Sequence, residues 1–147
     1  MEFGWINLFG AIIVVLIMIP NIIYAVNNKE ESMEIILPKI IVILEKIGRY
    51  GCIVLMWFPL LVWKFGFDSS IGFELYIIGN AILLMLYYLF WVMYFKKKTV
   101  VKGLVLAIVP TLIFLISGVL LKYWLLVLCA CVFGIAHIWI TYVTHKN

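Results

Sequence analysis

The sequence has very little charge for its length. Charged residues make up 12% of the 147 positions, about half the share that is usual in a soluble domain. Hydrophobic residues make up 67%, and no polar segment is long enough to form a water-soluble core of its own. The composition therefore excludes an ordinary soluble domain and indicates one polytopic membrane domain over residues 1–147.

A basic surface suited to nucleic acid is also missing. The net charge of +4 comes mostly from lysines in short connecting stretches, whereas nucleic-acid binding needs basic residues gathered on one face of a folded domain. In a membrane protein such lysines mark the orientation in the bilayer. We therefore expect membrane lipids as partners and no nucleic acid.

Cysteine is scarce, and its positions exclude two classes of site. Cys52, Cys129 and Cys131 all lie within apolar runs, and an odd number argues against a disulfide framework. Residues two apart on a helix point to nearly opposite sides, so Cys129 and Cys131 do not form half of a zinc site. No glycine-rich phosphate loop appears either. We expect no metal and no cofactor.

What the chain does have is long apolar runs, each about long enough to cross a bilayer as a helix. Five runs are found, at 3–26, 50–67, 75–95, 103–121 and 123–143. The first lacks a basic start and a cleavage motif, so we expect a retained helix rather than a signal peptide. Lys122 alone separates the last two, which predicts an antiparallel hairpin. The predicted fold is an all-α, five-helix transmembrane bundle.

A charged stretch in the first loop predicts a further element over residues 38–49. Apolar and charged residues occupy opposite faces there, which is typical of a helix lying in the membrane interface with its charges toward water. Glu45 and Arg49 on the polar face are spaced for a weak ion pair. The alternative is that 38–49 forms the first part of one long helix that continues into the second span.

Lysine and arginine are unevenly distributed over the connections, which predicts how the chain is threaded. With the amino terminus outside and the carboxyl terminus in the cytoplasm, most bases lie inside. These are Lys29, Lys39, Lys46, Arg49, Lys96, Lys97, Lys98, Lys102 and Lys146. Only Lys64 and Lys122 then lie outside. No organelle signal is seen, so we expect a multi-pass protein of a bacterial-type plasma membrane.

Polar side chains within the spans provide the candidate site, because an unpaired polar group facing hydrocarbon is costly. His137 is the only ionisable side chain well inside a predicted span, and no intramembrane carboxylate accompanies it, which argues against a proton relay. We predict that the first, third and fifth helices share a polar interior with a cavity beside Tyr87 and Trp91. The candidate ligand-binding residues are Asn7, Asn21, Asn80, Tyr87, Trp91 and His137. The alternative is that these groups only join neighbouring helices by hydrogen bonds.

Three function classes follow from this pattern. The first is a small membrane protein that binds or passes a small neutral or amphipathic ligand, lipid included, in a cavity of the bundle. The second is a scaffold or regulatory subunit that works through a membrane protein partner. The third, an intramembrane enzyme, has the least support, because the predicted spans contain neither a catalytic triad nor a pair of neighbouring carboxylates.

Overall fold

The structure, a computed structural model, describes residues 8–27, 38–58, 70–120 and 123–146. Within these ranges the chain forms five helices and no strand, which confirms the predicted all-α fold. The helices are α1 (Leu8–Asn27), α2 (Lys39–Trp57), α3 (Ser70–Lys96), α4 (Val100–Leu120) and α5 (Trp124–Lys146). The second predicted span, 50–67, is described only as far as residue 58.

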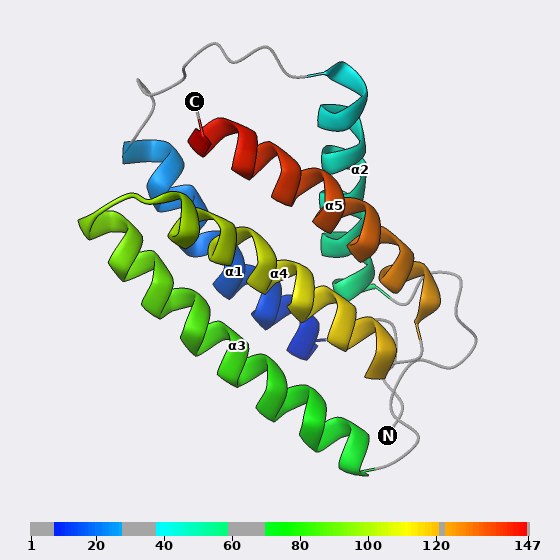
Figure 1. Cartoon of the computed structure of the whole chain (residues 1–147). Helices are drawn as coiled ribbons and strands as arrows, with labels where there is room; N and C mark the ends of the chain where they lie inside the picture. Colours follow the sequence, from blue (N-terminus) through cyan, green and yellow to red (C-terminus); the bar gives the residue numbers. More distant parts are fainter. Residues whose placement is uncertain (1–7, 28–37, 59–69, 121–122, 147) are drawn as a thin grey trace.

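Four helices are long and apolar enough to cross a membrane, namely α1, α3, α4 and α5. They lie roughly along one direction, while α2 crosses α5 steeply (Figure 1). Helix α2 is the exception in composition because it carries Lys39, Glu45, Lys46 and Arg49. The chain is therefore a multi-pass helical membrane bundle.

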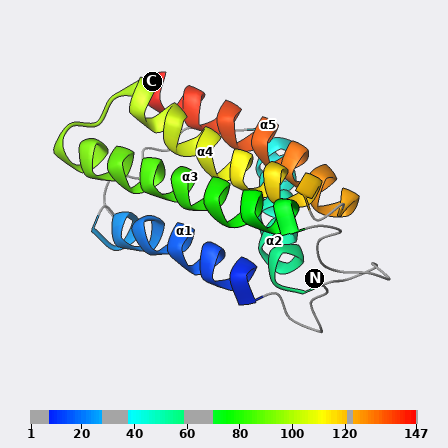
Figure 2. The same cartoon turned by 90° about the horizontal axis from the view of Figure 1, so that it is seen from below.

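The helices are neighbours in a closed order around the bundle. Helix α1 packs against α3, α3 against α4, α4 against α5, α5 against α2, and α2 against α1. Figure 2 shows α1 set against α3 at one edge of the row formed by α3, α4 and α5. The contacts of α1 with α2 are much less extensive than those between α4 and α5. The contacts of α1 with α3 are equally sparse, so α1 is held loosely on both sides.

Residues 38–49 do not form a separate interfacial helix. They continue without a break into the second predicted span as α2, so the long-helix alternative is the one that the structure has. The charged face is also not turned wholly to water, because Glu45 is only 6% exposed. Gly48 explains this: a Cβ there would lie 2.6 Å from the backbone nitrogen of Phe133. Helices α2 and α5 approach closely at this glycine, and the approach buries Glu45 one turn earlier.

Small residues also set the packing of α4 on α5, the predicted hairpin pair. A Cβ on Gly134 would lie 2.4 Å from Cγ2 of Thr111, and one on Gly118 would lie 2.8 Å from Cγ2 of Val127. A tightly packed part of the core lies along this contact and the neighbouring face of α3. Fully buried side chains there include Tyr76, Asn80, Ile113, Ser117, Tyr123 and Leu126.

Candidate ligand-binding cavity

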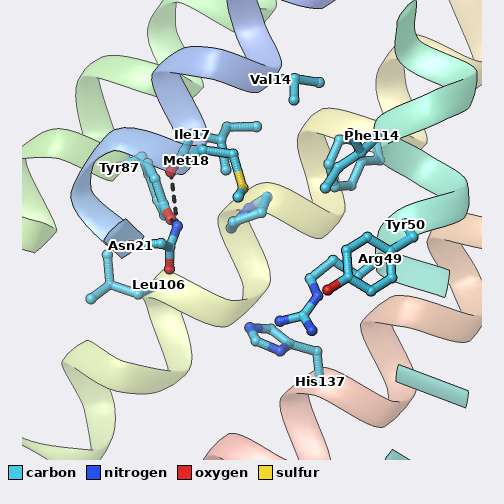
Figure 3. A pocket seen from close by; sticks show the side chains of 12 residues that line it. Val14, Ile17, Met18, Asn21, Arg49, Tyr50, Tyr87, Leu106, Phe114 and His137 are labelled. Carbon is cyan, nitrogen blue, oxygen red and sulfur yellow. Dashed lines mark hydrogen bonds between the residues drawn. The ribbon is translucent and has the colours of Figure 1, made fainter. Parts of the chain in front are cut away.

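A cavity of about 220 Å³ lies where the five helices converge (Figure 3). Its floor is one face of α4, where Leu106, Pro110 and Phe114 recur at four-residue steps. Its other walls come from α1, α2, α3 and α5, namely Val14, Ile17, Met18, Asn21, Arg49, Tyr50, Ile53, Tyr87 and His137. The space lies beside α1, whose contacts with α2 and α3 are equally sparse, whereas α2 packs extensively on α5. The cavity is larger than the engineered cavity of about 150 Å³ that binds benzene.

One end of the cavity carries an amide and a phenol. Nδ2 of Asn21 donates a hydrogen bond of 2.6 Å to the hydroxyl of Tyr87 and another of 2.8 Å to the carbonyl of Ile17. Figure 3 shows this pair on the opposite side of the cavity from Arg49 and His137. The Asn21–Tyr87 bond connects α1 to α3 at the wall of the cavity.

Pro20 explains a second connection between the same two helices. A proline inside a helix lacks the N–H that would bond the carbonyl four residues earlier, here that of Leu16. The hydroxyl of Tyr88 on α3 donates to that carbonyl at 2.6 Å. A free carbonyl in a bilayer is costly, so the proline in α1 requires a donor from α3. This bond helps to fix α1 beside the cavity.

The other end of the cavity is ionic. Oε1 of Glu45 lies 3.5 Å from Nη1 of Arg49, and the same oxygen lies 3.3 Å from Nδ1 of His137. The predicted ion pair between Glu45 and Arg49 is therefore confirmed as a contact. A carboxylate does accompany His137, however, which corrects the expectation drawn from the sequence. The close approach at Gly48 brings the charged turn of α2 against α5.

A smaller pocket of about 190 Å³ adjoins the cavity and shares Asn21, Leu106 and His137 with it. Its distinct walls include three aromatic residues, Tyr24, Trp91 and Tyr94. The ring of Tyr24 lies 5.6 Å from that of Trp91 and 5.7 Å from that of Tyr94. Nζ of Lys98 lies 5.0 Å from the centre of the Tyr24 ring. The aromatic cluster is therefore next to the triple lysine that follows α3.

The structure brings most, but not all, of the predicted site residues together. Asn21, Tyr87 and His137 line the main cavity, and Trp91 lines the adjoining pocket. Asn80 lines neither of these two; it is 1% exposed and donates to Oγ of Ser117 at 3.1 Å. Asn7 lies outside the described residues. That these residues bind a ligand stays a prediction.

Sequence reasoning missed Arg49 and Glu45 as site residues. A signal was present in the sequence, because Cys52 and Met56 are four residues apart and share one packing face, or seam, of a helix. Counting back seven residues from Cys52 gives Glu45, and counting back four gives Gly48. The buried residues of α2 follow this seam, namely Glu45, Gly48, Cys52, Leu55 and Met56. Extending the seam into the charged stretch would have predicted that Glu45 faces the bundle.

The described residues offer no cluster of three or more His, Cys, Asp or Glu side chains that could hold a metal ion. Cys52, Cys129 and Cys131 are all free thiols. No family model matches the chain, and neither the curated proteins nor the solved structures that were compared contain a match.

Proposed function

We propose that this protein binds or passes a small neutral or amphipathic ligand, lipids included, within the membrane. The observation that carries the proposal is the cavity itself, to which all five helices contribute and which has apolar walls between two polar ends. Ligand sites are typically concave and mostly apolar, with a few polar groups that fix orientation. The cavity of this bundle has that composition.

The ionic group supports a functional role. A charged side chain at membrane depth is costly and faces the interior of a bundle or a water-filled space. Arg49 and Glu45 lie beside the cavity on α2, which packs across α5. They do not belong to the triple lysine that follows α3. Packing alone would be served at lower cost by apolar residues. A site that has to recognise a polar group gives a reason to keep the charges there.

The position of the cavity favours a ligand that arrives from one leaflet. Tyr87 lies nine residues before Lys96 at the end of α3, or about 14 Å along the helix. Asn21 lies six residues before the end of α1, or about 9 Å. The cavity is thus nearer the lysine-rich end, which we propose to be the cytoplasmic end in a plasma membrane. We infer access from the cytoplasmic leaflet.

The orientation is tested by cysteine labelling in a variant that lacks the native cysteines. Thr99→Cys, between α3 and α4, should react with a membrane-impermeant maleimide only after the cells are opened. Trp124→Cys, at the amino-terminal end of α5, lies on the other side of the membrane in this threading. It should react on intact cells. Labelling of position 99 from outside would reverse the threading.

Ligand binding is tested by filling the cavity. Leu106→Phe and Met18→Phe each place a ring in it, whereas Leu112→Phe makes the same change as Leu106→Phe on an exposed part of α4. Lipids and amphipaths that co-purify with the protein in mild detergent are measured by native mass spectrometry. The two cavity variants should lose them and Leu112→Phe should keep them. Equal retention by all three variants would contradict the proposal.

A scaffold or regulatory role is the second candidate, and one surface feature favours it. An open apolar groove of about 670 Å³ runs along α4 and α5, and includes Thr111, Gly134, Ile135 and Trp139. A partner helix packing in this groove would cover Ile135, which is 77% exposed. This second proposal predicts co-purification of a membrane protein that is lost in Ile135→Ala and kept in Leu106→Phe.

A further inference from the structure

The free hydrogen-bonding capacity at the cavity indicates what the ligand carries. Nε of Arg49 and Oε1 of Glu45 are both buried and have no hydrogen-bond partner among the residues that the structure describes. Arg49 also lines the cavity, and Figure 3 shows its guanidinium group directed toward the space beside His137. Nε itself is closed to the cavity, but the Arg49 side chain as a whole is 37% exposed, so its guanidinium group can meet an acceptor supplied from the cavity.

Glu45 does not meet this demand. A single carboxylate oxygen, Oε1, contacts both Nη1 of Arg49 and Nδ1 of His137, at 3.5 and 3.3 Å. A guanidinium group has five N–H donors arranged as a planar fork. The carboxylate therefore neutralises the charge of Arg49 from one side and leaves another edge of the fork for a second group. Carboxylates and phosphates fit such an edge best, because two of their oxygens accept parallel hydrogen bonds.

The remaining walls define the other part of the ligand. Between Arg49 and Asn21 the cavity is lined by aliphatic, sulfur-containing and aromatic side chains, such as Ile17, Met18 and Phe114. These walls suit a hydrocarbon chain and offer nothing to a free hydrated anion. We infer that the ligand is a single-chain amphipath with an acidic head group, a carboxylate or phosphate, bound at Arg49. This inference rests on the proposed function, since it names the class of ligand for the same cavity.

The test compares three ligands with one chain and different heads: octanoate, octyl phosphate and octanol. Binding to the protein in phosphatidylcholine nanodiscs is measured by titration with native mass spectrometry, and inorganic phosphate is titrated as a fourth probe. Octanoate and octyl phosphate should bind at least about ten-fold more tightly than octanol, because a charge-assisted hydrogen bond is lost with the alcohol. Inorganic phosphate should not bind.

Variants of α2 assign the effect to the guanidinium group. Arg49→Gln should remove the preference for the acidic heads, so that octanoate and octanol bind with equal affinity, and Arg49→Lys should restore only part of the preference. The double variant Glu45→Gln/Arg49→Gln keeps the site neutral and guards against misfolding caused by an unpaired buried carboxylate. Lys46→Gln, an exposed charge on the same helix, is the matched control and should behave as the unmodified protein.

The outcomes separate this inference from the proposed function. If octanol binds as tightly as octanoate, and Leu106→Phe abolishes both, the cavity function stands and the acidic head group is refuted. If none of the three amphipaths binds, the proposed function fails with it. If inorganic phosphate binds as tightly as octyl phosphate, the site takes a free anion and the amphipath is refuted.

Discussion

Two asparagines connect neighbouring helices through their side chains, and they do so in very different surroundings. Asn80 on α3 donates to Ser117 on α4, and both residues are at most 1% exposed. Asn21 on α1 donates to Tyr87 on α3 at the wall of a cavity of about 220 Å³. The hydrogen bonds are of the same kind, but only the second one is beside space that a ligand can occupy.

The difference comes from the helices around each pair. One turn before Asn80 and Ser117 lie Tyr76 and Ile113, both 0% exposed, so that part of the bundle is filled by side chains. Beside Asn21, α1 makes only sparse contacts with α2 and with α3, and the space between them is not filled by side chains. A polar seam on a membrane helix therefore predicts that a residue faces inward, but the packing of its neighbours decides whether it joins helices or lines a site.

The largest expected effect comes from disturbing the α2–α5 contact that holds the ionic end of the cavity. Gly48→Ala places a Cβ 2.6 Å from the backbone of Phe133, whereas Gly79→Ala on α3 meets nothing within 4 Å. Both substitutions gain the same helix propensity, so their difference isolates the clash. Gly48→Ala should be less stable than Gly79→Ala by about 1–3 kcal/mol.

Thermal unfolding in detergent measures this difference. Because the two helices must separate to admit the methyl group, Arg49 should also move and amphipath binding should weaken. Gly79→Ala should leave binding unchanged. Equal melting temperatures for the two variants would show that α2 and α5 are not in close contact at Gly48.

Much of the architecture could be predicted from the sequence because membrane helices are constrained by length and by hydrogen bonding. The apolar runs at 75–95 and 103–121 appear as α3 and α4. The inward position of Asn21, Tyr87 and His137 followed from the cost of polar groups in lipid, and these three residues do line one cavity. The physical rule applies to each helix by itself, so one sequence was enough.

The ionic end of the site could not be predicted in the same way. Glu45 and Arg49 belong to a stretch whose charges suit a water-exposed face equally well, and only the tertiary contact at Gly48 buries Glu45. That contact depends on how α2 crosses α5, which is a relation between two helices and not a property of either one. For the same reason, the sequence did not distinguish Asn80 from Asn21.

The second prediction compares the same substitution at the two asparagines. Asn80→Leu removes the bond to Ser117 in the dense region and should lower the free energy of unfolding by roughly 0.6 to 2 kcal/mol, with amphipath binding unchanged. Asn21→Leu removes a polar group from the cavity wall, where the residue is exposed. It should alter amphipath binding, with a smaller loss of stability.

Thermal unfolding measures the stability of both variants, and titration with octanoate on the same preparations measures their binding. If Asn80→Leu weakens binding as much as Asn21→Leu does, the two regions are coupled and the distinction between them is wrong.

The smallest expected effect separates the cavity wall from simple attachment of α1 to α3. Tyr87→Phe and Tyr88→Phe each remove one hydroxyl that bonds α1, to Asn21 and to the Leu16 carbonyl respectively. Each should cost about 0.6 kcal/mol of stability, the average for a hydrogen bond between membrane helices.

Only Tyr87 lines the cavity, and without its hydroxyl the Asn21 amide is no longer held in place. Tyr87→Phe should therefore weaken octanoate binding by about five-fold, the equivalent of one hydrogen bond, and Tyr88→Phe should leave it unchanged. If both variants weaken binding equally, the site depends on the attachment of α1 as a whole, and the Asn21–Tyr87 pair has no direct part in recognition.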